Sequence, residues 1–253
     1  MKKSMKLINK LYSIFFLIFV IIIWQIAANN DIINTFHFSS PKEIFKDLLV
    51  LFKSGQVWPH IAATFGVSLA GLLLGTLSGI ALAFLFANFN ILNKIFDPIL
   101  VGLYGLPKLA LGPLFIIWFG IGIKAKIVMS TIMVFFQVFF NSYAGLKNID
   151  KELITTLKIF GANKIDILKK VALPSCVPWI AASLRTGAGA AVMGTIVGEY
   201  LGSNKGLGWM VQNAGGVYNI TRVLSCIFIL VIFMSIIDFI LKKMEKSILR
   251  WRP

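Results

Sequence analysis

The sequence predicts an all-α membrane protein with six transmembrane helices and both termini in the cytoplasm. Of its 253 residues, 58% are hydrophobic and only 14% are charged, a balance that soluble domains of this size do not have. Six apolar runs follow one another along the chain, most of them separated by short segments rich in lysine and arginine. The net charge of +15 therefore indicates orientation in a membrane rather than binding to nucleic acid.

The first predicted span covers residues 11–28, an uncharged apolar run just long enough to cross a bilayer. Four lysines precede it and also fit the start of a signal peptide. However, the apolar run is too long for one, and no clear small-residue cleavage site follows it. We therefore interpret residues 11–28 as a retained transmembrane helix.

A short amphipathic helix is predicted to begin at Ser40-Pro41-Lys42-Glu43, which has the pattern of a capping box. Its apolar positions are Ile44, Phe45, Leu48, Leu49 and Phe52, and its polar positions are Lys42, Lys46, Asp47 and Lys53. Such a helix is expected to lie along the membrane surface, or else to be a connector packed against the other helices.

The second span, near residues 61–87, carries Gly71, Gly75 and Gly79, a spacing that allows another helix to approach closely. The fifth span, residues 178–201, has a similar stripe of small residues at Ala190, Gly194 and Gly198. The fourth and sixth spans are expected near residues 127–144 and 223–241. We expect the two small-residue stripes to be helix-packing faces.

The third apolar run, residues 97–120, is interrupted by three prolines, Pro98, Pro107 and Pro113. Broken helices at membrane depth occur where the freed backbone groups are buried in protein or line a wet cavity. We therefore interpret this run as part of a translocation path, with simple proline kinks as the alternative. Lys108 is the candidate within it to meet a polar or anionic solute, although its amine could equally satisfy freed backbone carbonyls.

Three further charged residues lie within or at the ends of spans, where a charge needs a partner or water. Arg185 and Asp238 are both expected near the cytoplasmic end and are predicted to form a structural ion pair. Glu199 is expected near the outer end, where it would either gate the outer mouth or hold the end of its helix in place. The candidates for the translocation path are thus Lys108, Pro107, Pro113 and Glu199.

Orientation follows from the positive-inside rule. If the amino terminus is inside, the inner segments hold sixteen basic residues: Lys2, Lys3, Lys6, Lys10, Lys94, Lys147, Lys151, Lys158, Lys164, Lys169, Lys170, Lys242, Lys243, Lys246, Arg250 and Arg252. The outer segments hold seven: Lys42, Lys46, Lys53, Lys124, Lys126, Lys205 and Arg222. Both termini are therefore assigned to the cytoplasm.

Residues 147–174 form a polar, basic insert between the fourth and fifth spans, on the predicted cytoplasmic side. Asp150 is expected to cap a first short helix, which Gly161 ends in the left-handed conformation that glycine adopts at little cost. Asn163 is expected to cap a second helix, in which Asp166 and Lys170 can pair and which Pro174 ends. The insert would present an apolar ridge, formed by Leu153, Leu157 and Phe160, to a partner outside the membrane.

At the insert the chain resembles the permease subunits of binding-protein-dependent ABC importers. Gly161, Val171 and Leu173-Pro174 have the spacing of the EAA motif of that family, whose cytoplasmic helix inserts into a groove on the ATPase subunit. The segments 40–61, 107–122 and 192–209 are similar to the branch that imports nitrate, sulfonates, taurine and related compounds. The resemblance covers residues 38–245 and implies the type I ABC importer transmembrane-domain fold.

The resemblance also implies a division of the chain and a set of coupling residues. Residues 1–56 would hold the first transmembrane helix and the interfacial helix, residues 57–245 the importer domain, and residues 246–253 a basic cytoplasmic tail. The Glu-Ala-Ala positions of the motif are Thr155, Thr156 and Leu157 here, so the acidic residue of the motif is replaced by threonine. The predicted ATPase-coupling residues are Glu152, Leu153, Thr155, Leu157, Phe160, Gly161, Leu173 and Pro174.

No catalytic cluster, metal pattern or Walker A sequence is found, so the chain is expected to be a transport subunit rather than an enzyme. His37 and His60 are expected to be ordinary surface residues, and Cys176 and Cys226 packed thiols. The resemblance implies that this chain holds no cofactor, and that ATP and magnesium are bound by two partner ATPase subunits. It further implies a second permease subunit, giving a homodimer, an extracytoplasmic substrate-binding protein and a location in the cell membrane.

The solute implied by the resemblance is small and polar or anionic, such as a sulfonate, nitrate or taurine. The alternative is a vitamin or vitamin precursor, such as the thiamine pyrimidine or riboflavin, carried by the same architecture. An ion-driven secondary transporter would instead predict an inverted repeat and paired acidic residues near mid-membrane, and neither is evident in the sequence.

Overall fold

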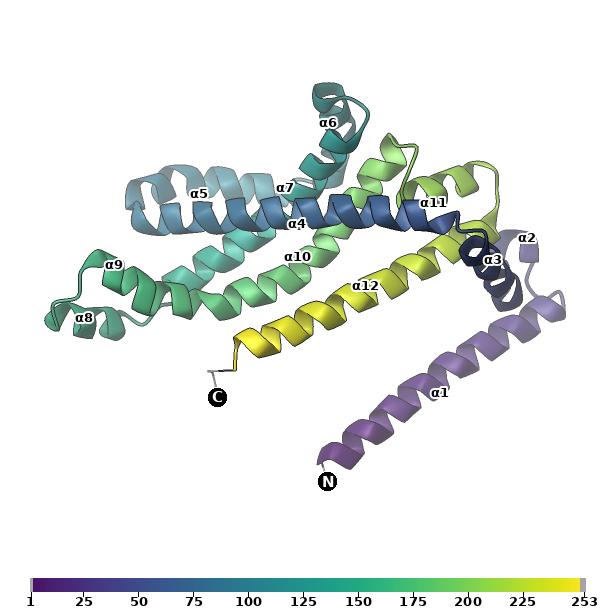
Figure 1. Cartoon of the computed structure of the whole chain (residues 1–253), viewed down its shortest axis with the longest axis horizontal. Coiled ribbons are helices and arrows are strands. Elements are labelled where there is room, and N and C mark those ends of the chain that lie inside the picture. The colour runs from purple at the N-terminus through teal and green to yellow at the C-terminus, as the bar shows by residue number, and fades with distance from the viewer. Residues whose placement is uncertain (1, 251–253) are drawn as a thin grey trace. The chain divides into compact units, whose positions relative to one another are not determined.

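The computed structural model describes residues 2–250, and the side chains of all of these except residues 2–10, 13, 90, 92–94, 97, 151 and 164. The described residues form helices joined by short connections, with no strand among them, which confirms the predicted all-α class (Figure 1). The last three residues of the predicted basic tail lie outside this described part. The chain divides into two compact units, Met1–Pro59 with Met210–Leu230, and His60–Trp209 with Val231–Pro253.

The first unit contains α1 (Lys2–Asn29), α2 (Thr35–Phe38), α3 (Pro41–Lys53), most of α11 (Leu207–Gly216) and the start of α12 (Ile220–Ile248). The predicted start of α3 is confirmed, because the Ser40 hydroxyl accepts a hydrogen bond from the Glu43 amide at 3.2 Å. The Glu43 carboxylate accepts a hydrogen bond from the Lys46 amine at 3.0 Å. Local hydrogen bonding thus determines where α3 begins.

One position on α3 differs from the prediction. Asp47 was expected on the polar outer face, but its carboxylate accepts hydrogen bonds from Arg222 Nε and Nη2 at 2.8 and 2.7 Å. Helical spacing explains the difference, because Asp47 follows the buried Ile44 by three residues and precedes the buried Leu51 by four. Asp47 therefore lies on the inward face, where the arginine of α12 meets its charge.

The second unit is built around α7 (Ile123–Lys147), which packs against both α4 (Val57–Asn88) and α10 (Leu173–Leu201). Both predicted small-residue faces are confirmed as packing faces, and both contact α7. A Cβ atom at Gly71 of α4 would overlap the Ser130 side chain, and one at Gly194 of α10 would lie 2.9 Å from Ser130 Cα. The Ser130 hydroxyl is fully buried and donates to the Ala191 carbonyl at 2.9 Å.

The contact between Gly71 and Ser130 predicts a measurable penalty for a single methyl group. Gly71→Ala should lower the free energy of unfolding by about 1–3 kcal/mol, because α7 cannot move away from α4 without pressing against Gly194 of α10. The matched control is Gly66→Ala on the same helix, where nothing lies within 4 Å of the added Cβ. That control should be neutral or stabilising, since alanine favours helix. Thermal unfolding in detergent compares the two, and equal midpoints would contradict the predicted packing.

The predicted break in the third run is also confirmed. It consists of α5 (Asn90–Gly105), the 3₁₀ turn η1 (Lys108–Leu111) and α6 (Gly112–Phe119), and its two arms meet at an angle of 85°. The sharp bend falls at Leu106-Pro107, where the proline lacks an N–H to continue the α5 ladder. By contrast, Pro98 lies inside α5 without ending it.

Four of the predicted spans correspond to helices that are long and apolar enough to cross a membrane: α4, α7, α10 with the turn before it, and α12. The bent pair of α5 and α6 would be a fifth span if it crosses as one unit. In α1, the apolar part with described side chains is Ile14–Asn29, which is shorter than the four candidate spans. A count of six spans therefore stays a prediction. Cys176 and Cys226 are both buried and free, as expected.

Candidate functional site

The insert between α7 and α10 contains two short helical segments that extend beyond the ends of those helices (Figure 1). In the first, α8 (Lys151–Ile159), the Asp150 carboxylate accepts a hydrogen bond from the Glu152 amide at 2.8 Å. Gly161 has a φ of +79°, and its amide donates to the Lys158 carbonyl at 3.0 Å. The predicted cap and the predicted glycine stop of this helix are therefore both confirmed.

The second segment begins as predicted. The Asn163 side chain accepts a hydrogen bond from the Asp166 amide at 2.9 Å, and the Asp166 carboxylate accepts one from the Asn163 amide at 3.1 Å. These reciprocal bonds start α9 (Lys164–Ile167). Asp166 also pairs with the Lys170 amine at 3.4 Å, one helical turn further along, as the spacing predicted.

The predicted end of this second helix at Pro174 is wrong. The chain continues from α9 through a π-helical turn, η2 (Leu168–Ala172), directly into α10, so Ile165–Leu201 is one helical run. The wider turn accommodates the proline, because the Leu173 amide bonds five residues back to the Leu168 carbonyl and Pro174 falls in the first turn of α10. Pro178, which was expected to begin the fifth span, instead lies inside α10.

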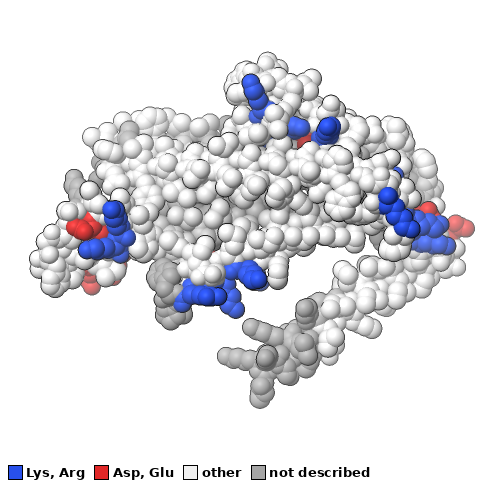
Figure 2. Space-filling model, in the orientation of Figure 1, with Lys and Arg blue, Asp and Glu red and all other residues white. Residues whose placement is uncertain are grey.

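The insert exposes large apolar side chains on an otherwise polar segment. Phe160, directly after α8, is 82% exposed, and Ile159, the last residue of α8, is 79% exposed, while Leu153 is about half exposed. Charged atoms gather over the same two segments, and the surface drawn along α4 is almost free of charge (Figure 2). Exposed apolar groups among charges are typical of a surface that binds a partner.

The predicted coupling residues do not all lie on this surface. Glu152, Leu153, Leu157 and Phe160 belong to α8 or its end, with Leu157 only partly exposed. Leu173 and Pro174 lie beyond the π turn, at the start of α10. The predicted coupling residues leave out two exposed apolar side chains, Ile159 and Ile165. Helical spacing had placed Ile165 on the apolar face of the second helix, with Leu168 and Ala172, but Ile159 at the end of α8 was not singled out.

In the bent third run, Lys108 satisfies a freed backbone carbonyl. Its amine donates to the Tyr104 carbonyl at 2.7 Å, an acceptor near the end of α5 that the bend at Pro107 releases from the helical ladder. The amine also lies over the Tyr104 and Phe136 rings, 4.6 and 5.2 Å from their centroids. Pro113 lies in the first turn of α6, where its missing N–H costs little.

Glu199 is completely buried and holds three segments of the second unit together. Its carboxylate accepts hydrogen bonds from the Thr64 hydroxyl of α4 at 2.9 Å and from the Gly208 amide of α11 at 2.9 Å. Gly206 has a φ of +120°, and a Cβ atom there would run into the same carboxylate. This geometry matches the predicted alternative in which Glu199 holds the end of its helix.

His60 is not the ordinary surface residue that was expected. Its Nδ1 accepts a hydrogen bond from the Gly206 amide at 3.1 Å, and its ring stacks on Trp209 at 5.2 Å between centroids. The Leu207 amide in turn donates to Thr64 at 2.9 Å. This cluster could not be predicted from sequence patterns. Its residues on α4 lie more than 130 positions from Glu199 and from the loop after α10, and they meet only in the fold.

Arg185 and Asp238 are joined as predicted. Arg185 Nε donates to one carboxylate oxygen of Asp238, and Nη2 donates to the other at 3.3 Å. Both side chains are more than one third exposed within the second unit, so solvent or lipid headgroups can reach them. Such an exposed pair positions α10 relative to α12 more than it stabilises the fold.

Among the residues that the structure describes, no group of histidines, cysteines and carboxylates is arranged to hold a metal ion.

Known proteins resemble this chain along most of its length. It is 32% identical to the formylaminopyrimidine transport permease protein ThiX of Halalkalibacterium halodurans over 254 residues, covering 100% of this chain and 99% of the relative. It is also 29% identical to the putative aliphatic sulfonates transport permease protein SsuC of Bacillus subtilis over 234 residues, covering 92% and 84% respectively.

The fold has a solved counterpart. The MetNI methionine ABC transporter in an inward-facing conformation superposes with a TM-score of 0.62 at 23% identity, covering 76% of this chain and 94% of that one.

Residues 71–250 match the family described as the binding-protein-dependent transport system inner membrane component. That match takes in α7, the insert, α10 and nearly all of α12. The chain therefore belongs to this family, the permease subunits of ABC transporters.

Proposed function

We propose that this permease forms the translocation pathway for a small polar or anionic solute and couples its import to ATP hydrolysis on a separate ATPase subunit. The observation that carries the proposal is the exposed apolar surface of the insert, centred on Phe160 and Ile159. Two adjacent, large apolar side chains that are each about four-fifths exposed on a charged segment are typical of a surface that binds a protein partner. In this family the ATPase subunit is that partner.

Coupling would then rest on apolar burial rather than on an ion pair. Thr155 occupies the position where the motif has glutamate, and Glu152 lies three residues earlier on α8, close to one helical turn away. Burying a phenylalanine side chain contributes about 1.5–3 kcal/mol, whereas an exposed ion pair contributes about 0–1 kcal/mol. The loss of the acidic residue is therefore a small change to this contact.

The insert is well connected to the membrane helices for transmitting motion. Because η2 joins α9 to α10 without a loop, a displacement of the insert is passed directly to α10 and, through the buried Ser130 contacts, to α7. Closure of two ATPase subunits on ATP would bring two inserts together in a permease dimer and open the pathway to a solute-loaded binding protein outside. Hydrolysis would reset it, so ATP and solute each favour a different shape of the permease.

The bent third run is the proposed lining of the pathway. The Lys108 amine has three N–H donors, of which one reaches the Tyr104 carbonyl, so donors remain for an anionic or polar solute. The aromatic rings of Tyr104 and Phe136 beside it would contact the apolar part of the solute. Both termini and the insert are proposed to face the cytoplasm, consistent with the distribution of basic residues.

A second candidate solute is a vitamin precursor of the formylaminopyrimidine type. The observation in its favour is that the relative named for this solute matches the chain from end to end at 32% identity. The relative named for aliphatic sulfonates is similar at 29% over a slightly shorter stretch. The two candidates differ in the solute and share the same coupling mechanism.

Reconstitution tests the proposed function. The permease is placed in proteoliposomes with its ATPase subunit and binding protein, and uptake of a radiolabelled alkanesulfonate and of a formylaminopyrimidine is measured with and without ATP. ATP should drive accumulation of one of these solutes, and a variant ATPase that cannot hydrolyse ATP should abolish it. Uptake that an ion gradient drives without ATP would contradict the proposal.

A further inference from the structure

One face of α3 in the first unit is apolar, basic and uncovered. Phe45, Leu49 and Phe52 follow one another at helical spacing and are 62%, 42% and 40% exposed, and Val50 beside them is 58% exposed. The opposite face holds the buried Ile44 and Leu51 together with Asp47, which Arg222 of α12 pairs. The buried face thus holds α3 in place, and the apolar face is left exposed.

The exposed charges of α3 are mostly positive: Lys42, Lys46 and Lys53, with Glu43 as the exposed carboxylate. The Lys46 amine pairs with Glu43 at 3.0 Å, and both side chains are more than half exposed, so water or salt screens the pair. Among the described residues, no carboxylate lies within ion-pair distance of Lys42 or Lys53. An exposed apolar stripe flanked by lysines is the pattern of a helix that lies at a lipid headgroup boundary.

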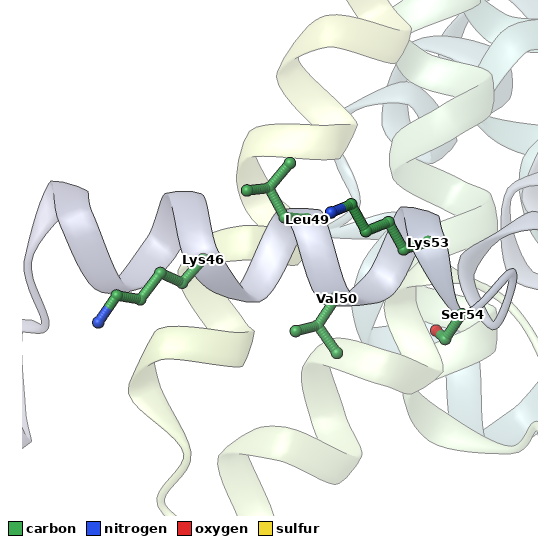
Figure 3. A pocket seen from close by; sticks show the side chains of 5 residues that line it. All are labelled: Lys46, Leu49, Val50, Lys53 and Ser54. Atoms are coloured by element: carbon green, nitrogen blue, oxygen red, sulfur yellow. The ribbon is translucent and has the colours of Figure 1, made fainter.

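A shallow hollow of about 610 Å³ lies on this face, lined by Lys46, Leu49, Val50, Lys53 and Ser54. Figure 3 shows Leu49 and Val50 between the two lysines along the helix, with the Lys53 side chain running back toward Leu49. A phosphate held by the Lys53 amine would therefore lie beside the apolar side chain of Leu49. This combination fits a ligand that has an anionic head next to a hydrocarbon chain.

We propose that this face of α3 is a binding surface for an anionic phospholipid. The lipid phosphate contacts the Lys53 amine, Lys46 adds positive charge further along the same face, and the upper part of an acyl chain lies over Leu49 and Val50. An acidic protein surface would also suit the lysines, but it would leave Phe45 and Val50 against polar groups. The apolar stripe therefore favours a lipid of the membrane in which this family resides.

Fluorescence quenching by brominated lipids tests the proposal in the full-length permease. Val50→Cys is labelled with a bimane fluorophore, and the natural Cys176 and Cys226 are buried and should not react. Nanodiscs then contain either brominated phosphatidylglycerol or brominated phosphatidylcholine. Half-maximal quenching is expected at about fivefold less phosphatidylglycerol, the preference that one uncompensated lysine near a lipid surface provides.

The lysine variants separate a specific contact from a general charge effect. Lys46→Gln/Lys53→Gln should remove the preference, whereas the matched control Lys124→Gln/Lys205→Gln, which also loses two exposed charges, should keep it. The comparison of the two lipids on the labelled protein needs no lysine substitution. It therefore tests the preference for an anionic lipid even if the Lys46→Gln/Lys53→Gln variant folds poorly. Equal quenching by both lipids would overturn the proposal. Shielding of the fluorophore only when the binding protein is added would overturn it in favour of a protein partner.

Discussion

Replacing Phe160 with aspartate is expected to reduce ATP-dependent uptake at least tenfold while the membrane helices stay folded. The side chain is 82% exposed in the free permease, so the substitution removes almost no internal packing. In the proposed complex the same ring is buried against the ATPase, where its loss costs about 2 kcal/mol or about thirtyfold in affinity, and a buried carboxylate costs more. Uptake into proteoliposomes and ATP hydrolysis by the same vesicles are the two readouts.

The matched control for this variant is Phe36→Asp, an exposed phenylalanine of α2 in the other unit. It introduces the same change in size and charge and should leave the stimulation of ATP hydrolysis by the loaded binding protein unchanged. Phe160→Asp should lose that stimulation along with uptake. Normal uptake by Phe160→Asp would mean that the ATPase docks elsewhere on the permease.

The second large effect is expected at Glu199. Glu199→Ala should lower the free energy of unfolding by about 3–5 kcal/mol, because it leaves the Gly208 amide without its acceptor, takes one partner from the Thr64 hydroxyl and opens a cavity. Glu199→Gln should cost less, since its amide oxygen can still accept one of the two hydrogen bonds. Thermal unfolding in detergent, followed by tryptophan fluorescence, measures both variants.

Glu43→Ala provides the control for Glu199, because it removes an equally large carboxylate from an exposed ion pair. Its cost should stay below about 1 kcal/mol. If Glu199→Ala unfolds at the same temperature as Glu43→Ala, the hydrogen bonds of the buried carboxylate do not hold α4, α10 and α11 together in the membrane protein. Glu199 would then again be a candidate for the gate at the outer mouth.

The features that the sequence predicted correctly depend on local rules. The caps at Ser40, Asp150 and Asn163 and the glycine stop at Gly161 are decided within a few residues of backbone hydrogen bonding. The small-residue stripes were also predictable, because their spacing of four keeps them on one helical face. The helix that these stripes contact could not be predicted, because α7 carries no complementary pattern beyond Ser130.

The errors arise where a local rule is overridden by context. A proline usually ends a helix, and Pro174 was therefore predicted to end one. The π turn before it instead leaves Pro174 in the first turn of α10, where its missing N–H is tolerated. Asp47 was predicted to be a surface residue because its partner, Arg222, lies 175 residues further along the chain and meets it only in the fold. The cluster of His60, Thr64 and Glu199 likewise forms only when α4 meets the loop after α10.

The most direct test of the proposed coupling surface is a photocrosslink from position 160 in the assembled, import-competent complex. Benzoylphenylalanine is introduced at Phe160 and, as a control, at Phe36, and the crosslinked chains are identified by mass spectrometry. Position 160 should crosslink to the ATPase subunit and position 36 should not. A complex that imports solute but forms no crosslink between position 160 and the ATPase would contradict the proposal that this surface transmits the work of ATP hydrolysis.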